Sequence, residues 1–132
     1  MIEIVFPVEF SERLAWLTAL ATIAVGLAFM ILPRQAGHLV GFALRPDNRN
    51  GLSEIRGPFG GFMVGMGVSC ILLAQPFTYF ALGLAFGFAV IGRLISFVAD
   101  RTVNTHCVVV TIIEALAAYF PLRFAFEAFG LV

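Results

Sequence analysis

Charge is scarce in this sequence. Only 12% of its 132 residues are Asp, Glu, Lys or Arg, whereas about 25% is usual for a soluble domain. Hydrophobic residues make up 61% of the chain, and the mean hydropathy is +1.00. A water-soluble surface is hard to build from this composition. We therefore expect a single integral membrane domain over residues 1–132 that contacts the lipid bilayer.

Lysine is absent, so all eight basic residues are arginines, and the net charge is zero. The guanidinium group is weakly hydrated and forks onto carboxylates, which suits ion pairs in buried or interfacial positions. The chain has no basic run and no interleaving of basic and aromatic residues. Nothing in it predicts a nucleic-acid partner.

Metal-binding and cofactor motifs are also lacking. Cys70 and Cys107 have no metal-type spacing, and His38 and His106 form no His-x-x-x-His pair. Residues 57–61 are glycine-rich, but they lack the Lys-Ser/Thr of a phosphate-binding loop. We expect no metal site and no bound cofactor.

What the sequence does contain is four apolar runs of about the length needed to cross a membrane, which is ~20 residues. They predict an all-α, four-helix membrane bundle. The second run starts at Pro58, which we expect at the first turn of its helix. The predicted spans are residues 14–32, 58–75, 77–99 and 105–126.

The links between the runs differ in length. The second and third runs are separated only by about Pro76, and the third and fourth by residues 100–104. The long connection lies between the first two runs. Its first half, residues 35–44, is moderately apolar and predicts an interfacial or re-entrant helix, whereas residues 45–51 are rich in turn formers.

The distribution of arginines predicts the orientation. Positive residues gather on the cytoplasmic side of membrane proteins. The excess of arginines lies on the side that holds two links, the one after the first span and the one after the third. We therefore expect this side to be cytoplasmic, with a long first cytoplasmic loop, and the termini to be periplasmic in a bacterial inner membrane. The arginines on that side are Arg34, Arg45, Arg49 and Arg101, with Arg56 and Arg93 near it, against Arg13 and Arg123 on the other.

Three ionisable residues interrupt the apolar segments: Arg56, Arg93 and Glu114. Intramembrane charges are costly and are functional-site candidates by default. Arg93 and Glu114 lie at similar depths on either side of a short turn, offset by roughly one helical turn, so we expect them to pair. Together with Glu54 and Arg56 they would form a four-residue cluster with no net charge, which a low-dielectric site requires.

Helical spacing adds weaker polar positions to this cluster. Ser96 and Asp100 share a helix face with Arg93, and Thr111 shares one with Glu114. The cluster has three open interpretations. It could pin the helices in register, serve a ligand, ion or proton, or contact a partner subunit or a lipid headgroup.

Glycines are frequent in the second and third runs, and small residues let helices approach closely in lipid. Gly60 shares a helix face with Arg56, Met63 and Gly67. The glycines that we predict at helix–helix contacts are Gly60, Gly61, Gly65, Gly83 and Gly87.

The segment Glu-Ile-Arg-Gly-Pro-Phe-Gly-Gly at residues 54–61, together with Gly92-Arg93 and Glu114, resembles a family of small bacterial four-helix membrane proteins described only as a domain of unknown function. The resemblance covers roughly residues 12–128. The family looks distantly similar to the DoxX-like group, some of whose members are quinone-linked. The resemblance implies the fold and the membrane location, and it supplies no chemistry.

Three functions are compatible with these features. The first is a non-enzymatic membrane component or accessory subunit with a membrane-protein partner or a second copy. The second is a binder or carrier of a small apolar or anionic molecule, such as a quinone or lipid, near Arg56 and Arg93. The third is a membrane enzyme or proton relay centred on Glu114.

Overall fold

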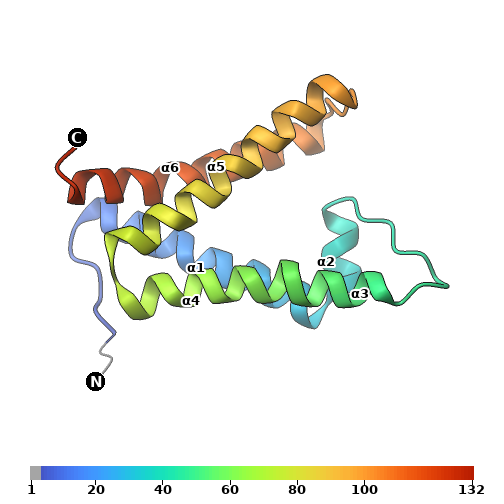
Figure 1. Ribbon diagram of the computed structural model, residues 1–132, viewed down its shortest axis with the longest axis horizontal. Helices are drawn as coiled ribbons and strands as arrows, with labels where there is room; N and C mark the ends of the chain where they lie inside the picture. The colour runs from blue at the N-terminus through green and yellow to red at the C-terminus, as the bar shows by residue number, and fades with distance from the viewer. Residues whose placement is uncertain (1–3) are drawn as a thin grey trace.

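The computed structural model describes residues 4–132, and this part of the chain is helical with no strand. The helices form four long stretches, with a long connection over residues 32–49 between the first two and short turns between the others (Figure 1). In chain order they are α1 (Phe10–Ile31), α2 (Pro33–Leu39), α3 (Asn50–Glu54), the π-helical η1 (Ile55–Gly61), α4 (Phe62–Leu73), α5 (Pro76–Ala99) and α6 (Thr105–Ala128).

Four helical stretches are long and apolar enough to cross a membrane. They contain 22 to 24 residues, or roughly 33–36 Å at 1.5 Å per residue, which matches the ~30 Å hydrocarbon core. The prediction of an all-α four-helix bundle is confirmed. The stretches are Phe10–Ile31, Asn50–Leu73, Pro76–Ala99 and Thr105–Ala128.

The second span begins earlier than the sequence predicts. Pro58 does not open the helix, because α3, η1 and α4 run on without a break from Asn50 to Leu73. Pro58 lies within the π-helical turn η1. A wider π turn alters the i−4 register in which a proline ring would clash with a carbonyl group, so the helix continues through it.

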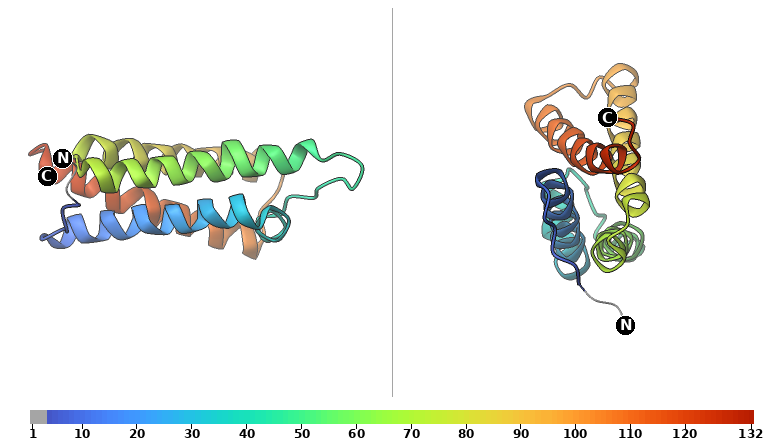
Figure 2. Two further views of the ribbon diagram at one scale, coloured as in Figure 1. Left: turned by 90° about the horizontal axis from the view of Figure 1, so that it is seen from below. Right: turned by 90° about the vertical axis from the view of Figure 1, so that its left-hand side faces the viewer.

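The four spans form two pairs that meet at one end. α1 packs along η1 and α4, while α5 packs along α6. Figure 1 shows the two pairs close together near the start of α1, the C-terminus and the α4–α5 turn, and diverging toward the α5–α6 turn. Figure 2 shows the same pairs from below and from the end.

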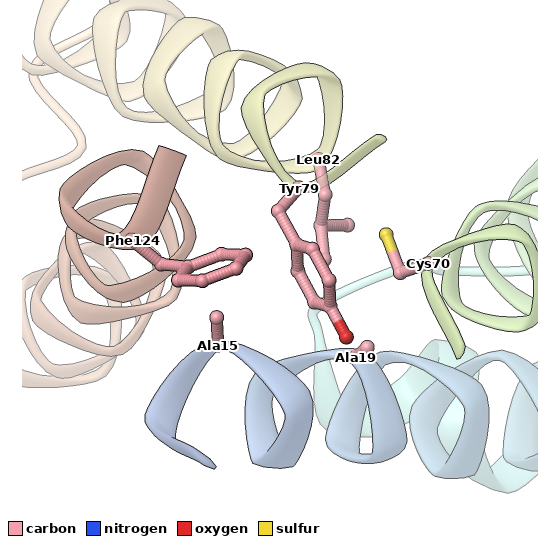
Figure 3. Packing of buried hydrophobic residues seen from close by; sticks show 6 residues of the cluster. All are labelled: Ala15, Ala19, Cys70, Tyr79, Leu82 and Phe124. Atoms are coloured by element: carbon pink, nitrogen blue, oxygen red, sulfur yellow. The ribbon is translucent and has the colours of Figure 1, made fainter. Parts of the chain in front are cut away.

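The main core lies at the end where the pairs meet. All four spans contribute to it, and Tyr79 of α5 packs edge-on against Phe124 of α6, with ring centroids 5.2 Å apart (Figure 3). The buried residues of this cluster are Ala15, Ala19, Cys70, Tyr79, Leu82 and Phe124. A second cluster, of Phe29, Ala36 and Ile55, joins α1, α2 and η1.

Glycines set the closest helix contacts. A Cβ on Gly60 would lie 2.8 Å from the carbonyl oxygen of Gly26, and one on Gly67 would lie 2.7 Å from that of Ala19, so α1 approaches both glycines closely. Gly83 likewise faces Ala118 of α6.

The other three glycines named from the sequence are not at such contacts. No neighbouring atom lies within 4 Å of the Cβ position of Gly65 or Gly87, and the nearest to that of Gly61 is a carbonyl oxygen 3.7 Å away. Gly26 and Gly67 do lie at close contacts, although neither is among the five glycines predicted there. Gly67 lies on the predicted face of Gly60, seven residues further on.

Candidate functional site

Arg93 and Glu114 join α5 to α6. The Arg93 Nε donates to Glu114 Oε2 over 2.5 Å, and Nη2 donates to Oε1 over 3.0 Å. This fork-to-fork geometry makes the strongest kind of ion pair. The two side chains are 31% and 19% exposed, so their own chain covers them only in part. The short α5–α6 turn brings the two positions to the same depth.

Glu54 and Arg56 do not join this pair, and the predicted buried cluster of four charges is not formed. Both residues are exposed. They lie in α3 and η1, of which η1 packs against α1, α2 and α4. Arg93 and Glu114 instead lie on the diverging α5–α6 pair (Figure 1). The divergence of the pairs at this end keeps the two sets of charges apart.

Arg56 has a different partner. Its Nη1 donates to the carbonyl oxygen of Met30 in the last turn of α1. The last four carbonyl groups of a helix have no partner within the helix, and the negative end of the helix dipole attracts cations. Arg56 therefore completes the end of α1 and ties it to η1.

The weaker polar positions form local hydrogen bonds. Ser96 Oγ donates to Asp100 Oδ2 over 2.8 Å and lies 3.1 Å from the Thr102 hydroxyl, so these three residues stabilise the α5–α6 turn. Thr111 donates to the carbonyl oxygen of Cys107, one turn earlier in α6. A residue that is not among the predicted polar positions, Asn104, accepts from the Cys107 N–H through its side chain over 3.0 Å. Asparagine before an apolar helical run is an N-cap signal that could have identified it.

The thiols and the candidate metal ligands are dispersed. Cys70 and Cys107 are free, and Cys70 is buried. Within residues 4–132, no group of three or more His, Cys, Asp or Glu side chains could hold a metal ion.

The chemistry available to the Arg93–Glu114 pair is limited by its own geometry. Both carboxylate oxygens of Glu114 accept from Arg93, so each charge already has its counterion. A paired carboxylate of this kind favours a positional role over that of a free base. The pair links α5 directly to α6.

Comparison with known proteins gives one family assignment. No curated protein and no solved structure matches the chain. Residues 11–122 match the family described as a domain of unknown function, DUF4345. This range is close to the one covered by the resemblance seen in the sequence, and the match carries no link to DoxX-like proteins. Because the match extends over most of the 132 residues, the chain belongs to the DUF4345 family.

Proposed function

We propose that this protein is a non-enzymatic component of a membrane assembly, an accessory subunit that docks through α5 and α6. One observation carries the proposal. The half of the α5–α6 pair next to its turn, residues 84–99 and 105–117, contains no buried residue, although it holds the Arg93–Glu114 pair. We call this part of the molecule the open half-hairpin.

The energetics of charge in lipid support this role. An ionised side chain facing hydrocarbon is costly, and intramembrane charges usually face protein or a water-filled space. Arg93 and Glu114 are paired but remain 31% and 19% exposed. A docked helix would remove this remaining exposure without breaking the ion pair.

Glycine positions in the open half-hairpin support the same role. Gly87 and Gly92 of α5 have no neighbouring atom within 4 Å of their Cβ positions. Small residues allow the backbone of a second helix to approach closely, which favours helix association in lipid. Large apolar side chains, including Ile91 and Leu94, are about half exposed beside them.

The orientation that we propose places the open half-hairpin toward the cytoplasm of a bacterial inner membrane, with both termini periplasmic. The arginine excess on the side of α2 and the α5–α6 turn supports it. The C-terminus and the start of α1 lie at the opposite end (Figure 1).

Site-specific photocrosslinking in native membranes tests the proposal. A photoreactive amino acid at Ile91 or Leu94 should give an adduct of discrete mass with a protein, and the same group at Leu72, exposed on α4, should not. The adduct mass distinguishes a second copy from a different chain. Gly87→Leu should reduce the adduct, while Gly65→Leu, at an equally open position on α4, should leave it unchanged. Adducts with lipid alone at all three positions would contradict the proposal.

A further inference from the structure

The short helix α2 has a different direction from the four spans. Figure 1 shows it turned away from the line of α1 at the end of that helix, and the left view of Figure 2 shows it nearly end-on. α1 contains 22 residues, roughly 33 Å, which is enough to cross the hydrocarbon core. A helix that begins at Pro33 and turns away from the line of α1 would therefore lie along a membrane surface.

One face of α2 is fixed to the spans. Pro33, Ala36 and Gly37 are buried, and a Cβ on Gly37 would lie only 3.1 Å from the Cδ1 of Ile55. This close fit holds the helix against the start of the second span.

The end of α2 is held by a Schellman motif. Gly41 has a φ of +89°, the Phe42 N–H donates to the Gly37 carbonyl over 2.8 Å, and the Gly41 N–H donates to that of His38 over 3.1 Å. Phe42 then packs edge-on against Phe59, with ring centroids 5.3 Å apart. The outer face of α2 is thus presented by a fixed backbone.

That outer face is a shallow, wide-open hollow lined by Arg34, Gln35, His38 and Leu39. Arg34 and His38 are four residues apart and both are exposed, so they lie on one side of the helix. Within the described chain, Arg34 forms no ion pair. The hollow therefore combines hydrogen-bond donors with an uncompensated positive charge.

We propose that this hollow binds the headgroup of an anionic phospholipid. Phosphate oxygens would accept hydrogen bonds from the Arg34 guanidinium, the Gln35 amide and the His38 ring. Leu39 is 73% exposed and would contact the lipid below its phosphate, which distinguishes a lipid from a free anion. The inference is independent of any partner at the open half-hairpin.

The charge around α2 supports an anionic ligand. Residues 33–56 contain four arginines and two carboxylates, so this connection is net positive, and basic clusters on the cytoplasmic side of spanning helices attract anionic lipid. The charged residues are Arg34, Arg45, Arg49 and Arg56 against Asp47 and Glu54.

Native mass spectrometry on protein in phosphatidylcholine nanodiscs with a minor fraction of phosphatidylglycerol tests the proposal. The double variant Arg34→Gln, His38→Gln should retain phosphatidylglycerol about fivefold more weakly than the unaltered protein, as expected for one lost surface arginine contact. Arg101→Gln, which removes an exposed arginine from the α5–α6 turn on the same side, should retain it normally. Thermal stability of each variant checks that its fold is intact.

Three results would overturn the proposal. Equal losses in the double variant and in Arg101→Gln would mean that only the general surface charge attracts the lipid. Unchanged retention in the double variant would mean that the hollow binds no headgroup. Displacement of phosphatidylglycerol by an equal concentration of inorganic phosphate would assign the hollow to a soluble anion.

Discussion

Arg93 of α5 and Glu114 of α6 bind each other through two parallel hydrogen bonds, of 2.5 and 3.0 Å, across the hairpin that these helices form. A double-mutant cycle measures what this relationship contributes. Because the pair is partly exposed, Arg93→Leu or Glu114→Leu should each destabilise the protein by about 2 kcal/mol, between the values for exposed and buried pairs. The double variant should recover most of this loss in thermal unfolding in detergent.

Arg123 and Glu127 provide the control for that cycle, because their ion pair lies within α6 and joins no second helix, and Arg123 is 47% exposed. Arg123→Leu should leave thermal unfolding nearly unchanged, because exposed ion pairs contribute little to stability. If Arg93→Leu costs no more than Arg123→Leu, the Arg93–Glu114 pair does not hold the hairpin in register. Water, a ligand or a partner would then be satisfying both charges.

The contact between α1 and α4 makes a second prediction, based on two glycines of the same helix. A Cβ on Gly67 would lie 2.7 Å from the Ala19 carbonyl oxygen, whereas one on Gly65 would meet nothing within 4 Å. Gly67→Ala should therefore destabilise the protein by ~1–3 kcal/mol through overpacking. Gly65→Ala should be neutral or stabilise by up to ~1 kcal/mol, because alanine favours the helix. Equal effects on thermal unfolding would show that α1 does not approach α4 through Gly67.

Arg56 carries a third prediction, about the end of α1. Arg56→Met keeps most of the apolar stem but removes the hydrogen bond to the Met30 carbonyl, and the loss should be about 1 kcal/mol. Arg49→Met removes a nearby exposed arginine that makes no such bond, and it should leave thermal unfolding unchanged. Equal stability of the two variants would mean that water replaces Arg56 at the Met30 carbonyl.

The spans could be predicted from the sequence because a long apolar run has few alternatives to a membrane helix. α5 and α6 begin at Pro76 and Thr105, within a residue of the predicted starts. The Arg93–Glu114 contact follows from the same information. A turn of only five residues makes α5 and α6 pack side by side, and it restricts which positions of the two helices can lie at the same depth.

The rest of the candidate site depends on contacts between distant segments. Residues 50–57 are polar and rich in turn formers, yet they are helical because Ile55 is buried in the second core cluster and η1 packs along α1. The positions of Glu54 and Arg56 along their helix could be estimated from the sequence, but the neighbouring helices that their side chains face could not be predicted. The glycine contacts could be predicted only in part for the same reason, because the sequence alone does not say which face of α4 meets α1.

The final prediction concerns the orientation in the membrane, which rests on the arginine distribution. In a cysteine-free background, a single cysteine at Asn104, in the α5–α6 turn, should be protected from a membrane-impermeant maleimide added to intact spheroplasts. One at Gly130, past the end of α6 at the opposite end of the molecule, should be labelled. Both should react after the membrane is opened, which controls for local accessibility. Labelling of Asn104→Cys but not Gly130→Cys in intact spheroplasts would reverse the proposed orientation. α2 and the open half-hairpin would then lie at the periplasmic face. The lipid and the protein that we propose to bind them would have to reach them from that side.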